Sequence, residues 1–80
     1  MSWFVYVLKS DVDGRLYKGM SENILERLAT HNKGKVSSTR AYRPWKLVYT
    51  QPCKDSTEAR ECEKYLKSSK GRDFLKSLGI

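Results

Sequence analysis

The sequence is poor in the residues that build disulfide-bonded or zinc-bound scaffolds. Its 80 residues contain two cysteines, Cys53 and Cys62, and a single histidine, His31. The cysteines allow at most one bridge, and without an export signal we expect them to remain reduced. Two cysteines and one histidine do not supply the four ligands of a zinc finger. The sequence therefore predicts a fold that is held by its own hydrophobic core.

Long hydrophobic runs are also lacking. The longest apolar stretch covers residues 3–8, whereas a helix that crosses a bilayer needs about 20 apolar residues. The stretch is also too short for the core of a signal peptide, and no cleavage pattern follows it. We therefore expect no membrane association and a cytoplasmic location.

Acidic residues are in the minority. The chain has 16 lysines and arginines against 9 aspartates and glutamates, which gives a net charge of +7. With 39% hydrophobic and 31% charged residues, the composition is typical of one globular domain, expected over residues 1–80, and it excludes a disordered tail or a multi-domain protein. The positive charge favours a polyanionic partner, most commonly nucleic acid. A merely soluble, lysine-rich surface is the alternative.

Three segments are predicted as strands. Residues 3–8 are continuously aromatic, aliphatic or β-branched, which indicates a strand buried on both faces and hence central in its sheet. Asp13 and Gly14 form a typical hairpin turn before a return strand at residues 16–20. Gly19 in this strand suggests the close approach of another backbone or of a ligand. Residues 45–50 form the third strand.

A first helix is predicted after Asn23, which forms a capping pair with Glu26 and precedes an apolar stripe. Gly34 is expected to end this helix in a left-handed conformation. The predicted stripe consists of Ile24, Leu25, Leu28 and Ala29.

A second helix is predicted to begin after Asp55, which pairs with Glu58 in the same way. Gly71 is read as a bend before a short terminal helix. The apolar stripe of the second helix is expected to contain Ala59, Cys62, Tyr65 and Leu66. The fold class is α/β in the broad sense (α+β): a small three-stranded antiparallel or mixed sheet flanked by helices, in the order β-β-α-β-α-α.

Several polar residues lie beside these apolar stripes. Arg27 and His31 are four residues apart and share one side of the first helix, at the flank of its stripe. Glu63 takes a similar position on the second helix, next to Cys62. Taken singly, each has a plain explanation as a surface arginine, a helix-capping histidine or a solvated acid.

Taken together, these residues resemble a known family. The resemblance rests on Tyr6 in the first strand, on Tyr17-Lys18-Gly19 in the second, on Arg27 and His31-Asn32 in the first helix, and on Glu63 in the second. In this order and over essentially the whole chain, they resemble the GIY-YIG nuclease domain, and most closely its small stand-alone bacterial members. The sequence departs from the pattern at residues 4–5, at Lys18, and at Met20, where some relatives, including excision-repair nucleases, carry a lysine.

The resemblance implies the GIY-YIG endonuclease fold and a metal-dependent hydrolysis of phosphodiester bonds in DNA, either structure-selective or non-specific, in a setting such as DNA repair. It implies that Glu63 holds a single Mg²⁺ or Mn²⁺ ion and that Arg27 stabilises charge in the transition state. Tyr17, with Tyr6 nearby, would orient or deprotonate the attacking water, and His31 would assist proton transfer or phosphate binding.

The expected partner is nucleic acid, with DNA as the expected substrate. Basic side chains predicted to lie along it are Lys18, Lys33, Lys35, Arg40, Arg43 and Lys67. Two alternatives stay open. One is a nucleic-acid-binding module with weak or no cleavage activity, which the residue at position 20 favours. The other is a protein-interaction domain that uses Trp3, Trp45 and the terminal helix.

Overall fold

The computed structural model describes residues 2–80. Its three strands form one antiparallel sheet in the order β2-β1-β3. The strands are β1 (Trp3–Ser10), β2 (Leu16–Ser21) and β3 (Trp45–Cys53), and the helices are α1 (Ile24–Asn32), the short 3-10 helix η1 (Arg40–Tyr42), α2 (Ser56–Lys67) and α3 (Ser69–Ser77). Apart from η1, this is the predicted order of elements, and the predicted α+β class is confirmed.

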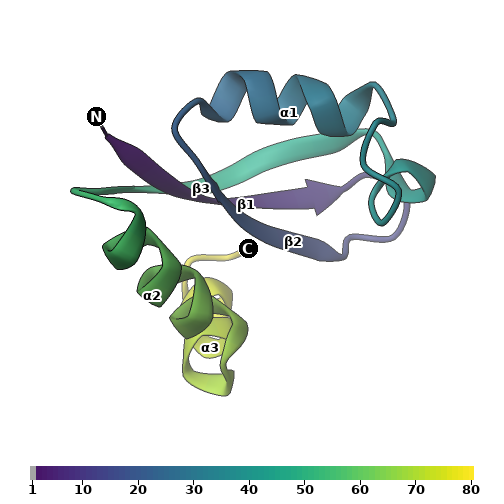
Figure 1. Cartoon of the computed structure of the whole chain (residues 1–80). Helices are drawn as coiled ribbons and strands as arrows, with labels where there is room; N and C mark the ends of the chain where they lie inside the picture. Colours follow the sequence, from purple (N-terminus) through teal and green to yellow (C-terminus); the bar gives the residue numbers. More distant parts are fainter. Residues whose placement is uncertain (1) are drawn as a thin grey trace.

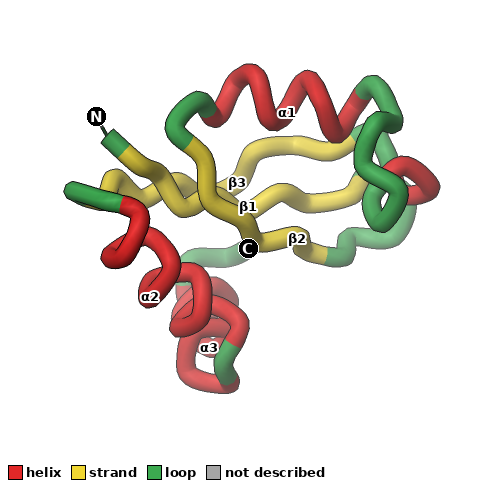
Figure 2. The backbone as a smooth tube through the Cα atoms, in the orientation of Figure 1, coloured by secondary structure: helices red, strands yellow, loops and turns green. Residues whose placement is uncertain are grey.

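The central strand β1 has helices on both sides. Val5 and Val7 are fully buried under α2 and α3, and Tyr6 and Leu8 are fully buried under α1. Figures 1 and 2 show α1 on one face of the sheet and the pair α2 and α3 on the other. The prediction of a central strand that is buried on both faces is therefore confirmed. Its apolar run is uninterrupted because alternate side chains enter two separate cores.

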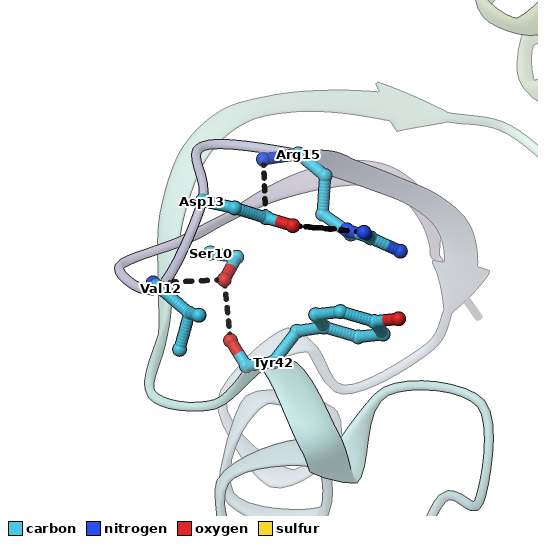
Figure 3. A network of polar contacts seen from close by, with 5 residues as sticks. All are labelled: Ser10, Val12, Asp13, Arg15 and Tyr42. Carbon is cyan, nitrogen blue, oxygen red and sulfur yellow. Dashed lines mark hydrogen bonds and ion pairs between the residues drawn. The ribbon is translucent and has the colours of Figure 1, made fainter.

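The β1–β2 turn is fastened to the segment that precedes β3 (Figure 3). The Ser10 hydroxyl donates to the carbonyl oxygen of Tyr42 and accepts a bond of 3.0 Å from the backbone N–H of Val12. Asp13 pairs with Arg15 at 2.8 Å, and the Arg15 guanidinium lies 3.5 Å above the centre of the Tyr42 ring. These contacts hold η1 beside the hairpin.

The inward side of α1 differs from the prediction. Ile24 and Leu28 do face the core, but Leu25 is 75% exposed and Ala29 is also exposed. The positions that complete the inward side, at i+3 and i+7 from Ile24, are Arg27 and His31. The predicted stripe was therefore wrong at Leu25 and Ala29. It was chosen by hydrophobicity alone, whereas the fold turns the polar residues Arg27 and His31 inward.

The junction of α2 and α3 also corrects two predictions. Tyr65 is 47% exposed and is not part of the apolar stripe. Gly71 lies buried inside α3, and the bend is at Ser68, whose side chain accepts from the N–H of Gly71 at 3.2 Å. A Cβ at Gly71 would collide with the carbonyl oxygen of Tyr65 and the Cα of Leu66. Glycine at this position therefore permits the close packing of the two helices.

Cys53 and Cys62 are free thiols. Burial raises the pKa of both above the usual value for cysteine, which disfavours their thiolate forms. Within residues 2–80, no helix has the length and apolar character needed to cross a bilayer.

Candidate active site

Two tyrosines meet on the α1 face of the sheet, over β2. Tyr6 is paired in register with Gly19, and a Cβ at Gly19 would lie only 2.6 Å from the Tyr6 hydroxyl oxygen. The glycine therefore leaves room for the Tyr6 ring, whose centre lies 6.3 Å from that of Tyr17. The sequence predicted the approach of another backbone or of a ligand at Gly19; that was wrong in its partner, because the near atoms belong to the side chains of Tyr6 and Tyr17.

His31 connects this pair to the loop that follows α1. It is fully buried, with its ring centre 4.8 Å from that of Tyr17. Its Nε2 lies 3.3 Å from the Tyr6 hydroxyl oxygen, and its Nδ1 lies 2.8 Å from Oγ1 of Thr39. His31 is therefore enclosed by the fold, with a partner at each ring nitrogen.

The hydrogen bonds favour one tautomer of His31. The Thr39 hydroxyl donates to the carbonyl oxygen of Val36 at 3.4 Å, and its oxygen is then free to accept from Nδ1–H of His31. In this tautomer Nε2 has no proton and accepts from the Tyr6 hydroxyl. Burial, assisted by the positive charge of Arg27, lowers the pKa of His31 and so keeps the ring neutral.

Thr39 is a site residue that sequence reasoning missed. It is buried and lies in the loop just before η1, and its carbonyl oxygen also accepts from Nε1 of Trp45 at 2.9 Å. No periodicity marks a threonine in a polar loop, and its position depends on contacts with α1 and β3 that are distant in sequence.

Two further candidate residues, Arg27 and Glu63, act on the ionisation of Tyr6. Burial raises the pKa of Tyr6, and this effect is opposed by the nearby Arg27 guanidinium. The charges of Tyr17 and Glu63 add to the rise in this pKa. Arg27 reaches the phenol from α1, whereas Glu63 comes from α2, the helix on the opposite face. The structure thus brings Tyr6, Tyr17, Arg27 and His31 together, with Glu63 within electrostatic reach.

Glu63 is the carboxylate suited to holding a metal ion. Its side chain is 21% exposed, and one oxygen lies 3.7 Å from Nζ of Lys67. Within residues 2–80, no group of three or more His, Cys, Asp or Glu side chains gathers around one point. A lone, partly exposed carboxylate fits Mg²⁺ or Mn²⁺, since such ions keep several waters and bind through one or two carboxylates and substrate phosphates.

Asn32 has a structural part in the site. Its Oδ1 accepts from the N–H of Trp45 at 2.7 Å, and its Nδ2 donates to the carbonyl oxygen of Trp45 at 3.1 Å. This pair of bonds ties the end of α1 to the start of β3 in the way that a neighbouring strand would. The tie fixes both ends of the loop that contains Thr39.

The predicted basic residues fall into two groups. Those of the α1–β3 loop are all exposed, with Arg43 packed against Gly34, whose φ of +77° confirms the predicted left-handed helix end. They are Lys33, Lys35, Arg40 and Arg43. Lys18 pairs with Val7 in register and therefore lies on the α2 and α3 face, away from Tyr17. Burial lowers the pKa of Lys18, and the positive charges of Arg72 and Lys67 lie near enough to add to this effect.

The fold and this constellation define a nuclease-like α+β domain. Residues 2–76 match the family model described as the GIY-YIG catalytic domain. The chain therefore belongs to the GIY-YIG family, which is a family of endonucleases and implies a nucleic-acid substrate. GIY-YIG nucleases generally use divalent metal ions.

Small bacterial proteins are similar over most of the chain. A UPF0213 protein of Desulfotalea psychrophila is 37% identical over 95% of this chain and 73% of its own length. One of Bacillus licheniformis is 46% identical over 82% of this chain and 68% of its own length. The NMR structure of a UPF0213 protein from Bacillus halodurans matches with a TM-score of 0.58 and 32% identity, over 98% of this chain and 85% of that one. These names state no activity.

Proposed function

We propose that this protein is a metal-dependent endonuclease that hydrolyses phosphodiester bonds in DNA. The observation that carries the proposal is the buried hydrogen-bonded series Tyr6–His31–Thr39, in which a neutral imidazole accepts from the Tyr6 hydroxyl through its unprotonated Nε2. A buried histidine held in this way supports proton transfer, whereas a sheet that only binds nucleic acid has no need of it.

The two tyrosines have different surroundings and so different roles in this proposal. Tyr17 is half-buried and reaches the surface, whereas Tyr6 is buried. Tyr17 therefore orients the attacking water. The Tyr6 oxygen takes a proton from that water while its own proton passes to Nε2 of His31, across the 3.3 Å between the two atoms.

Side chains from α1 and α2 stabilise the charge that develops in the transition state. The Arg27 guanidinium stabilises the negative charge that develops on the phosphate oxygens. Glu63 would hold the Mg²⁺ or Mn²⁺ ion, which when bound supplies Lewis-acid polarisation of the phosphate. The exposed cations of the α1–β3 loop contact the backbone of the substrate.

The test is incubation of the purified protein with labelled DNA and RNA of single-stranded, duplex, flap and branched structure, each with Mg²⁺, Mn²⁺ or EDTA. We expect nicking of DNA with metal and none in EDTA. Cleavage in EDTA, or cleavage of RNA alone, would contradict the proposal.

A second candidate is a nucleic-acid-binding module without cleavage. One observation favours it: Met20 pairs with Val5 and packs in the core on the α2 and α3 face, so this position places no cation beside Tyr17. Salt-sensitive binding without cleavage under every metal condition would select this candidate. Salt-insensitive binding to a protein partner would instead favour an interaction domain.

A further inference from the structure

A cleft lies between β2 and α3, on the face of the sheet opposite α1. It encloses about 300 Å³ and has an apolar floor of Leu16 and Leu75. Its other lining residues include the basic residues Lys18, Arg72 and Lys76, together with Arg15, whose guanidinium lies over the Tyr42 ring. In Figure 1, α3 and the C-terminal end lie below β2 and away from α1. The cleft is therefore separate from the tyrosine pair.

The charge of this cleft is largely uncompensated. Arg15 is paired with Asp13, but Lys18, Arg72 and Lys76 have no acidic partner within 4.0 Å in the described part of the chain. Asp73 lines the adjoining hollow with Arg72 and Lys76 but forms no ion pair with them. Burial, and then the charges of Arg72 and Lys67, lower the pKa of Lys18. Gathered cations of this kind repel one another until an anion binds between them.

The cleft is linked to the catalytic site by Lys67. Its Nζ lies 3.7 Å from Glu63, whose charge acts on Tyr6, and its own charge acts on Lys18. Lys67 and then Lys18 thus form a series of positive charges that leads from Glu63 towards α3. The α1–β3 loop contributes its cations from the other side of the sheet.

We propose that this cleft binds the phosphodiester backbone of a nucleic-acid strand that extends from the catalytic site past β2 to α3. The inference rests on the proposed function and adds the path of the substrate beyond the scissile phosphate. Lys18, Arg72 and Lys76 contact backbone phosphates, while Leu16 and Leu75 give the cleft an apolar floor. The ligand group is the phosphodiester of the backbone. A free phosphate ion and a mononucleotide carry similar anionic oxygens and could bind through the same cations.

The experiment compares three double variants by DNA binding in EDTA over a range of salt concentrations. Arg72→Ala/Lys76→Ala removes cations of the cleft, Lys35→Ala/Arg40→Ala removes cations of the loop, and Lys54→Ala/Arg60→Ala is the control with the same change in net charge. We expect the cleft variant to weaken binding and to lower the slope of log K against log salt by about 2, the control leaving it nearly unchanged.

A second measurement separates the possible sources of phosphate. Backbone amide signals of Gly14 and Leu16, which line the cleft, are followed by NMR during titration with a 12-nucleotide DNA, with inorganic phosphate and with a mononucleotide. We expect saturable shifts with DNA at concentrations at which the small anions produce none. Equal affinity for inorganic phosphate would overturn the backbone assignment in favour of a small-anion site.

The outcomes distinguish this inference from the function on which it rests. If the loop variant weakens DNA binding and the cleft variant matches the control, the cleft assignment is wrong and the nuclease proposal stands. If the unaltered protein binds no nucleic acid, both are wrong. Thermal unfolding of each variant shows whether a loss of binding reflects a loss of folded protein.

Discussion

His31 shows how a single residue acquires a chemical role from its surroundings. In the sequence it is one polar residue near the end of a helix, whereas in the structure it is fully buried between Tyr6 and Thr39. A buried imidazole without partners would be costly, and here each ring nitrogen has one. Its inward position follows from the rotation of α1 relative to the predicted stripe, which no count of apolar residues would reveal.

The ionisation of His31 gives a direct prediction. Its folded-state pKa is lowered by burial and by Arg27, from an unfolded value of about 6.5. Between the folded and the unfolded pKa, the unfolded chain binds the proton of His31 more readily than the folded protein does. The free energy of unfolding therefore falls as the pH drops from the unfolded pKa to the folded pKa. Above the unfolded pKa, the contribution of His31 to stability is constant. Because the chain has one histidine, its ring NMR signal reports the folded value without ambiguity. A midpoint at or above 6.5 would contradict a buried, neutral ring.

Thr39 is predicted to act as a positioning residue. Thr39→Val keeps the shape but leaves the buried Nδ1–H of His31 unpaired, which should lower the free energy of unfolding by about 1–3 kcal/mol. It should also lower kcat, with a smaller effect on KM, and alter the pH profile of cleavage, because the tautomer in which Nε2 carries no proton is no longer favoured.

Thr39→Ser retains the hydroxyl and should restore most of this activity, and Thr50→Val on the exposed part of β3 is the control. Urea unfolding and cleavage rates between pH 6 and 9 provide the comparison. Equal pH profiles for Thr39→Val and the unaltered protein would show that the hydroxyl only fills space.

At the scale of elements, local signals predicted where helices begin. Asn23 accepts from the N–H of Glu26 at 3.1 Å and Asp55 from that of Glu58 at 2.8 Å, as the two capping pairs indicated. These signals succeed because their partners are three residues away. The short helix η1 and the inward side of α1 were not predicted, because both depend on contacts with distant strands.

Gly71 tests the packing of α2 against α3. Gly71→Ala should lower the free energy of unfolding by roughly 1–3 kcal/mol, because the added Cβ meets the backbone of α2, which cannot rotate away as a side chain would. This loss outweighs the higher helix propensity of alanine. Lys70→Ala, at the exposed neighbouring position, is the control in the same urea titration. A Gly71→Ala variant as stable as its control would mean that the helices do not pack as closely as described.

At the scale of the whole molecule, the candidate residues come from helices on both faces of the sheet. The α1 layer contributes Arg27 and His31, and the α2 layer contributes Glu63. The net charge of +7 predicted a polyanionic partner but not where it binds, since that depends on which cations the fold gathers. The family pattern identified the candidate residues, while the structure supplied the hydrogen bonds and the neutral histidine.

The most direct test of the account is cleavage rate against Mn²⁺ concentration for the unaltered protein, Glu63→Gln and Arg27→Ala, with DNA binding measured alongside in EDTA. Both variants should lose cleavage at low metal. Glu63→Gln should recover in part as Mn²⁺ rises, because a weakened site still fills by mass action, and should bind DNA at least as well as the unaltered protein. Arg27→Ala should not recover, because added metal does not replace the guanidinium. Cleavage by Glu63→Gln at the unaltered rate at low Mn²⁺ would show that Glu63 is a solvated surface acid and would contradict the account.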